Sequence, residues 1–189
     1  MTRRTPPRPG RAERAATPDD VAAMIRVDHA GETAAVRIYR GQLAVLGASP
    51  ATARAAELVR HMKAQEDAHL ETFERLVAER GVRPTALAPV WDVASYALGA
   101  ITALMGEKAA MACTEAVEEV IDDHYARQQT QLEGRDGELE EVVARFRAEE
   151  IEHRDTARAE GAREAAGYPV LSAVIKAGCR MAIRLSEKI

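Results

Sequence analysis

Aromatic side chains and cysteines are both scarce in this chain of 189 residues. Phe, Trp and Tyr make up 4 % of it, although 47 % of the residues are hydrophobic and 30 % are charged. A composition that is poor in aromatic residues and rich in alanine and charge favours helices over strands. The two cysteines, Cys113 and Cys179, are too few for a disulfide framework and lack a metal-ligand spacing, so we expect both to be reduced thiols.

The N-terminal segment lacks the apolar run that a secretory signal requires. Residues 1–17 instead hold five arginines, one glutamate and three prolines, and we interpret them as a disordered basic tail without a convincing mitochondrial presequence. The remainder, residues 18–189, is long enough for a single domain with a real core. Since the whole chain has a net charge of −4, this remainder is acidic, which argues against nucleic acid as a partner.

Capping residues, glycines and prolines divide the chain into helices. Thr17-Pro18 and Ser49-Pro50 each place a cap residue before a proline at the first helical position. Glycine and proline then mark the helix ends. We expect helices from residue 18 to about 46 and from 50 to about 80, a third long helix before Gly134–Gly137, a fourth ending at Gly167 and Pro169, and a last helix over roughly 170–187.

Two segments differ from ordinary bundle helices. Residues 93–106 contain no charged side chain but are too short to span a bilayer, which needs about 20 residues. They predict either a buried core helix or a helix at a membrane surface. In the last helix, four basic residues at i+4 spacing predict either a solvated face or a contact with anionic lipid: Lys176, Arg180, Arg184 and Lys188. Together the two segments favour a peripheral membrane protein.

One pattern of glutamate and histidine occurs twice. Glu32 is followed by Glu66-Asp67-Ala68-His69, and Glu118 is followed by Glu150-Ile151-Glu152-His153. Glu and His at i and i+3 share a helix face. A lone Glu from each of two helices and a Glu-x-x-His from each of two others form the ligand set of a carboxylate-bridged two-metal site inside a four-helix bundle. This set points to oxygen chemistry at iron, with the predicted ligands Glu32, Glu66, His69, Glu118, Glu150 and His153.

Two ferrous ions per chain suit this ligand set. Four glutamates offset their positive charge, so the core stays neutral, whereas an unpaired charge in the interior is very costly. We therefore expect metal loading to stabilise the fold. The pattern also predicts an internal repeat of residues 20–80 and 107–165. Tyr39 and Tyr125 each lie seven residues, or two turns, after the lone glutamate of their half and on its face.

Neighbouring polar residues carry less specific predictions. Tyr125 should point toward the metal pair, where it either relays electrons and protons or packs in the core, and His124 precedes it. His29 either hydrogen-bonds a ligand or is a cap or surface residue, and His61 is interpreted as a surface residue. By their spacing, four acidic residues next to the ligands point away from the ligand face. We interpret them either as groups that contact the ligands from outside or as surface residues: Asp67, Glu119, Glu149 and Glu152.

Four stretches of the chain resemble the demethoxyubiquinone hydroxylases. They are Asp28-His29-Ala30-Gly31-Glu32, Gln65-Glu66-Asp67-Ala68-His69, Val117-Glu118-Glu119-Val120-Ile121 with His124-Tyr125, and Glu149-Glu150-Ile151-Glu152-His153. The resemblance covers roughly residues 20–189, and no ligand position departs from the pattern. It implies an all-α, ferritin-like four-helix bundle with a di-iron core and one or two additional apolar or amphipathic helices. The family's six ligands fall on the positions named above, and its His-Tyr pair near the site falls on His124 and Tyr125.

The resemblance also implies an activity. Members of this family are O2-dependent monooxygenases of ubiquinone biosynthesis, and their substrate is the ring of a polyprenylated methoxy-methyl-benzoquinol, demethoxyubiquinol. They are peripheral inner-membrane proteins, can take NADH as reductant, and many work with a lipid-binding partner protein. For this chain the expected location is the cytoplasmic face of a bacterial inner membrane, with the matrix side of the mitochondrial inner membrane as the alternative.

Two other functions use similar ligands. A ferritin-like protein of iron storage or peroxide scavenging would oxidise iron without an organic substrate, although the Cys-rich module of a rubrerythrin is absent. A membrane-associated helical scaffold with a vestigial metal site is the other interpretation, and the intact ligand set argues against it. A single-turnover assay with a quinol separates the three.

Overall fold

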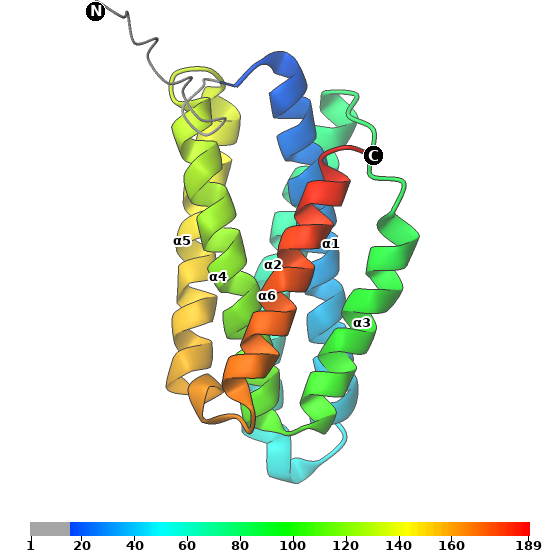
Figure 1. Ribbon diagram of the computed structural model, residues 1–189, viewed down its shortest axis with the longest axis vertical. Coiled ribbons are helices and arrows are strands. Elements are labelled where there is room, and N and C mark those ends of the chain that lie inside the picture. The colour runs from blue at the N-terminus through cyan, green and yellow to red at the C-terminus, as the bar shows by residue number, and fades with distance from the viewer. Residues whose placement is uncertain (1–15) are drawn as a thin grey trace, which may run out of the picture.

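Two long helical hairpins form the centre of the molecule in the computed structural model, which describes residues 16–189 (Figure 1). The first hairpin pairs α1 (Pro18–Leu46) with α2 (Ala53–Glu79), and the second pairs α4 (Glu107–Leu132) with α5 (Gly137–Ala159). Outside this four-helix bundle, α3 (Ala88–Leu104) packs against α1, and α6 (Tyr168–Ser186) packs against α4. Short 3-10 turns span Pro50–Thr52 and Ala162–Glu164. The prediction of an all-α bundle with additional helices is confirmed.

The first helix begins where the sequence predicts. The Thr17 hydroxyl accepts a hydrogen bond from the Asp20 backbone N–H, and the Asp20 carboxylate accepts one from the Thr17 N–H at 2.9 Å. This reciprocal capping box fixes the start of α1. Of the predicted basic tail, only Ala16 and Thr17 fall within the described residues, and the remainder lies outside them.

The predicted end of the fourth helix is wrong. α5 stops at Ala159 rather than near Gly167. Gly161 adopts a left-handed backbone with φ 85°, which side chains disfavour and which ends the helix. Gly167, with φ 70°, instead forms the turn that precedes α6. The chain therefore reverses earlier than the proline pattern indicates, and α6 starts at Tyr168.

Of the three apolar clusters in residues 16–189, two occupy opposite ends of the four-helix bundle, and the third lies between α1, α4 and α6. On α1, Ile25 belongs to one end cluster and Leu46 to the other, and on α2 the same division separates Phe73 from Met62. The middle of each helix is left between the two end clusters, and the predicted metal ligands occur there. Packing on both sides therefore holds the polar centre and keeps water away from it.

α3 crosses α1 at two glycines. A Cβ atom on Gly99 would lie 2.0 Å from the Ile38 carbonyl oxygen, and a Cβ atom on Gly41 would lie 2.2 Å from the Tyr96 carbonyl oxygen. Real side chains do not tolerate such contacts, so the two backbones approach this closely only because glycine lacks a Cβ atom. The crossing fixes where α3 sits on the bundle.

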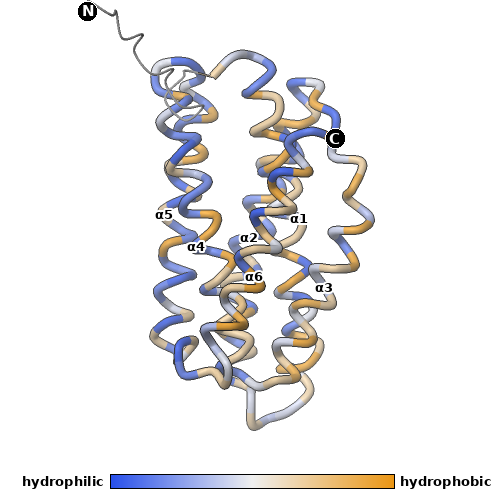
Figure 2. The backbone as a smooth tube through the Cα atoms, in the orientation of Figure 1, coloured by the Kyte–Doolittle hydropathy of each residue, from blue (hydrophilic) through white to orange (hydrophobic). Residues whose placement is uncertain are grey.

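Hydrophobic residues recur along α3 (Figure 2), and most of its large apolar side chains are exposed. Val93 is 70 % exposed and Leu104 is 73 % exposed, whereas within this helix only Gly99, Thr102 and Ala103 are buried. The alternative of a buried core helix over residues 93–106 is therefore wrong, because α3 lies outside the bundle and uses one narrow face to contact it. Within residues 16–189, no helix is both long enough and apolar enough to cross a membrane.

Candidate metal centre

The structure brings all six predicted ligands together in the middle of the bundle. α1 and α4 each contribute one glutamate, while α2 and α5 each contribute a glutamate and a histidine one turn later. None of the six residues is more than 3 % exposed. Burying four carboxylates this deeply without cations would be very costly. The cluster therefore has the composition and burial of a metal site.

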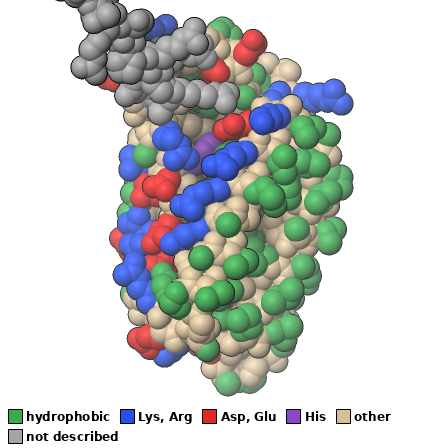
Figure 3. Space-filling view, viewed as in Figure 1, with side chains coloured by type: hydrophobic (Ala, Val, Ile, Leu, Met, Phe, Trp, Pro, Cys, Tyr) green, Lys and Arg blue, Asp and Glu red, His purple; other side chains and the backbone are tan. Residues whose placement is uncertain are grey.

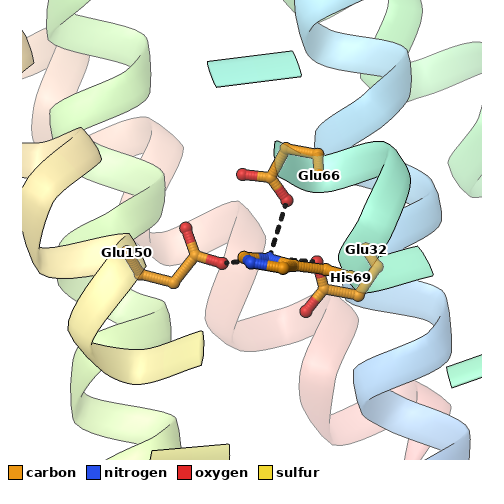
Figure 4. A group of neighbouring side chains, drawn as sticks. All are labelled: Glu32, Glu66, His69 and Glu150. Carbon is orange, nitrogen blue, oxygen red and sulfur yellow. Dashed lines mark ion pairs between the residues drawn. The ribbon is translucent and has the colours of Figure 1, made fainter. Parts of the chain in front are cut away.

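The six side chains form two overlapping groups. Within each group, one potential ligand atom per residue lies within 4.8 Å of the others. Glu66 and Glu150 belong to both groups, Glu32 and His69 to the first alone, and Glu118 and His153 to the second alone. Figure 4 shows the first group, with carboxylates from three different helices directed at the His69 ring. Glu66 and Glu150 could therefore each supply a ligand atom to both of two metal ions.

Both histidines direct their Nδ1 atoms to the centre. His69 Nδ1 lies 3.2 Å from a Glu150 oxygen, and His153 Nδ1 lies 3.0 Å from the other Glu150 oxygen and 3.1 Å from Glu66. Both carboxylate oxygens of Glu66 and the Nδ1 atom of His69 are buried without a hydrogen bond of normal geometry. Since buried polar atoms are almost always satisfied, these atoms fit bound metal ions.

Burial and mutual contact shift the pKa values of several residues of the centre. Burial raises the pKa of Glu32 and of Glu118 well above the usual range. Burial opposes the charged form of His153, but hydrogen bonds to Glu150 and Glu66 prevail and raise its pKa to about 11. Glu66 behaves in the opposite way, because burial raises its pKa but the two neighbouring imidazoles outweigh burial and lower it to about 2. In the metal-free protein, His153 is therefore protonated at neutral pH.

Metal should stabilise the protein, and the stabilisation should shrink as the pH falls. A divalent ion at His153 must displace a proton, so lower pH favours the protonated, metal-free form. At a metal concentration of 100 times Kd the gain is about 2.7 kcal/mol, or roughly 5–10 °C in Tm for a chain of this size. Differential scanning calorimetry with and without Co²⁺ at pH 8 and pH 6 measures both effects. An equal Tm with and without metal at pH 8 would contradict the prediction.

Two tyrosines hold the outer glutamates. The Tyr125 hydroxyl donates to a Glu32 carboxylate oxygen at 2.5 Å, and the Tyr39 hydroxyl donates to a Glu118 oxygen at 3.1 Å. Tyr125 thus points into the centre as predicted. Each tyrosine contacts the glutamate of the other half of the chain, and not the one seven residues before it on its own helix. The contacts cross the bundle in matching pairs, as an approximate two-fold relation between the halves requires.

His124 lies beside the centre and is held by residues outside the six. Its Nε2 atom is 3.0 Å from Asp28, and the Gln128 amide nitrogen donates to the same Asp28 oxygen at 2.8 Å. Burial raises the pKa of Asp28, although the hydrogen bond to His124 counteracts it. Asp28 belongs to a stretch that carries the family resemblance, but the sequence analysis gave it no role of its own. Its position one turn before Glu32, and therefore on the same helix face, was the available signal.

The other predicted neighbours separate into surface and interior residues. Asp67 forms an ion pair with Lys63 on α2, and Glu119 forms one with Arg158. Three further residues lie outside both ligand groups: Glu152 and His61 are exposed, and His29 is partly buried near Glu74.

Two residues contact the back of the ligand histidines. The Glu149 carboxylate lies 2.5 Å from Nε2 of His69, so it contacts this histidine on the side away from the centre. Gln65 lies 3.0 Å from Nε2 of His153. Its role was not predicted, because a contact between helices leaves no spacing signal in the sequence.

Comparisons with known proteins show the family of this chain. The family model described as Ubiquinone biosynthesis protein COQ7 matches residues 19–186. A 3-demethoxyubiquinol 3-hydroxylase of Rhodospirillum rubrum is 55 % identical over 166 residues, which cover 88 % of this chain and 77 % of that relative. The human mitochondrial NADPH-dependent 3-demethoxyubiquinone 3-hydroxylase is 47 % identical over 170 residues, or 88 % and 76 % of the two chains. The mitochondrial 5-demethoxyubiquinone hydroxylase of Saccharomyces cerevisiae is 41 % identical over 181 residues, or 88 % and 77 %. A match over nearly all of the described helices establishes that this chain belongs to the COQ7 family of ubiquinone biosynthesis proteins.

Proposed function

We propose that this hydroxylase of ubiquinone biosynthesis uses O2 and two iron ions per chain to hydroxylate the ring of a polyprenylated methoxy-methyl-benzoquinol, demethoxyubiquinol. The observation that carries the proposal is a buried set of four glutamates and two histidines with two carboxylates shared between two ligand groups. The relatives named above are hydroxylases of this substrate class. Bound iron would supply electrons and open coordination positions for O2.

An apolar groove supports a substrate with a long hydrocarbon tail. It has a volume of about 290 Å³ and runs between α1, α3 and α6, lined by residues such as Trp91, Ile38 and Met181. Further in, Val27, Gly31 and Ile183 line both this groove and a small cavity that reaches Glu32 and Glu118. In this proposal the groove would hold the prenyl chain, and its inner end would hold the quinol ring next to the ligands. The apolar walls exclude water from the reacting ring.

A single-turnover assay tests the proposed reaction. The protein is loaded with ferrous iron without air, mixed with a short-tailed demethoxyquinol and exposed to ¹⁸O2, and the product is read by mass spectrometry. The expected product carries one ¹⁸O atom, and it should be lost in Glu118→Ala. Iron oxidation with unchanged quinol would instead support storage or scavenging, or the need for a partner protein. A scaffold with a vestigial site would neither oxidise iron nor change the quinol.

The outer surfaces of α3 and α6 support membrane association. Figure 3 shows hydrophobic side chains gathered over these helices, with a row of basic side chains beside them. Val170 and Val174 of α6 are 70 % and 66 % exposed, close to the values for Val93 and Leu104 of α3. An exposed apolar patch of this extent, bordered by basic residues, suits an anionic lipid surface. The groove opens between the same two helices, so a quinol in the bilayer would enter it there and approach the small cavity beside Glu32 and Glu118.

Charged substitutions in this apolar patch should release the protein from vesicles. Glutamate at Val93, Leu104 and Val174 removes three apolar anchors, each worth about 1.5–3 kcal/mol when fully buried, so we expect at least about 10-fold weaker binding. Flotation with vesicles containing phosphatidylglycerol measures it. The matched control adds the same charge at exposed alanines of α2 and α5, namely Ala64, Ala144 and Ala148. If both triple variants lost vesicle binding equally, the added negative charge would explain the loss, and the apolar patch would not be the membrane contact.

Substitutions in the basic row of α6 (Lys176, Arg180, Arg184 and Lys188) would be harder to interpret. Lys176 forms an ion pair with Glu119 of α4, and Arg180 approaches Asp123 at 3.9 Å. Both residues therefore help to pack α6 onto the bundle, in keeping with a solvated helix face. Arg184 and Lys188 are exposed and available to lipid headgroups. Replacing all four with glutamate would change packing and lipid attraction together.

The reductant and the location complete the proposal. NADH is the reductant that the resemblance implies, whereas the names of the mouse and human relatives read NADPH-dependent, so both nicotinamides belong in the turnover assay. The eukaryotic relatives are mitochondrial by name. For this chain we propose a peripheral position on the cytoplasmic face of a bacterial inner membrane, with the mitochondrial matrix side as the alternative. A lipid-binding partner protein would present or extract the quinol there.

A further inference from the structure

The two halves of the centre match closely but not completely. Each half supplies a lone glutamate held by a tyrosine, and a Glu-x-x-His pair. The difference lies in the residue just before each pair, which is Gln65 on α2 and Glu149 on α5. Each of these side chains reaches across to the histidine of the opposite half. One ligand histidine is therefore backed by a carboxylate and the other by a neutral amide.

The hydrogen bonds themselves reflect this difference. Since Nδ1 of each histidine faces the centre, a metal-bound ring carries its proton on Nε2 and donates it outward. His69 Nε2 lies 2.5 Å from the Glu149 carboxylate, whereas His153 Nε2 lies 3.0 Å from the Gln65 side-chain oxygen. A hydrogen bond to an ionised acceptor is shorter and stronger than one to a neutral acceptor. It also makes the imidazole a stronger metal ligand.

We propose that the two metal positions are unequal, and that the position formed by Glu32 and His69 binds a divalent ion before the position formed by Glu118 and His153. Glu149 and Gln65 are positioning residues in this scheme, because they act through the histidines. The proposal rests on the two-metal centre of the proposed function and adds an order of loading to it.

The surroundings of the two positions differ in the same direction. One turn before Glu32 stands Asp28, and one turn before Glu118 stands Thr114. Gln128 donates to Asp28 at 2.8 Å, and its counterpart Gln42 lies 3.4 Å from the Thr114 hydroxyl. The Glu32 side thus has an acidic residue where the other side has a neutral hydroxyl.

Packing adds to this asymmetry. The His69 ring stacks on Phe146 with 3.8 Å between ring centroids, while His153 meets Tyr39 edge-on at 6.3 Å. A stacked ring with an ionic hydrogen bond has less freedom to turn, so less order must be imposed when the metal binds.

Cobalt titration of the full-length protein tests the order of loading. Co²⁺ is added without air and followed by visible absorption and calorimetry. We expect two steps whose dissociation constants differ by about 10- to 100-fold, the usual effect of an outer hydrogen-bond partner on metal affinity. Glu149→Gln gives both histidines an amide partner, so the first step should weaken and converge on an unchanged second step. Gln65→Glu gives both a carboxylate, so the second step should tighten toward the first.

The control makes the same chemical change elsewhere on α5. Glu152→Gln replaces an exposed carboxylate outside both ligand groups and should leave both constants unchanged. Circular dichroism checks folding, and Gln65→Glu decides alone if Glu149→Gln does not fold. Two equal steps in the unmodified protein, or a Gln65→Glu variant with an unchanged second step, would overturn the order. Absence of any cobalt binding would overturn the metal centre of the proposed function as well, so the two failures are distinct.

Discussion

Replacing Glu150 with alanine should abolish hydroxylation and strip the centre of metal. Glu150 is one of two carboxylates that belong to both ligand groups, and its two oxygens lie 3.2 Å from His69 and 3.0 Å from His153. Its loss removes a ligand from both metal positions at once and leaves too little negative charge for two divalent ions. We expect less than one bound iron per chain and at least about a 100-fold loss of product in a single turnover, larger than the effect of an outer partner.

The matched control for this variant is Glu152→Ala on the same helix. Glu152 is exposed two residues further along α5 and lies in neither group. Elemental analysis of anaerobically loaded protein gives the iron content, and mass spectrometry gives the product. The control should keep two irons and full turnover. Retention of both irons by Glu150→Ala would mean that the ligands are not those of the two groups described above.

The centre is the part of this structure that the sequence predicts best. The helix period places the predicted ligands on one face of each of four helices: Glu32, Glu118 and the two Glu-x-x-His pairs. From that period alone, these four faces are expected to be buried toward the common axis of the bundle. The contacts of Gln65 and Glu149 were out of reach, because each spans two helices whose relative rotation is a property of packing. The same reason explains why Tyr125 meets Glu32 and not Glu118.

Helix ends and the outer helices were harder to predict. The segment before α6 offers glycine at positions 161 and 167 and proline at 169, and any of these ends a helix. The structure uses the first of them. The uncharged run over residues 93–106 was compatible with a buried or an outer helix. Hydropathy alone does not tell whether the protein core or a membrane surface contacts an apolar helix. Close backbone contact with α1 fixes α3 outside the bundle. In the sequence, this contact is marked by Gly41 and Gly99.

Gly99→Ala should therefore destabilise the protein and disturb its groove. The new Cβ atom would meet the Ile38 carbonyl oxygen at 2.0 Å and the carbonyl carbon at 2.8 Å, and backbone atoms cannot rotate away. α3 must move outward. The cost of such overpacking is about 1–3 kcal/mol, or roughly 2–12 °C in Tm for a chain of this size, measured by calorimetry. Gly178→Ala is the control for stability alone, because Gly178 also lines the groove; nothing lies within 4 Å of its Cβ position, so the change should be neutral or stabilise α6 by about 0.5–1 kcal/mol.

The same variant separates the groove from the metal centre. α3 contributes Trp91, Ala94 and Ser95 to the groove but none of the six ligands. A displaced α3 should therefore raise KM for a long-tailed quinol several-fold while iron content stays at the level of the unmodified protein. A short-tailed quinol, which needs less of the groove, should be affected less. Equal losses with both quinols, or a loss of iron, would place the role of α3 in the stability of the whole bundle and not in holding the prenyl chain.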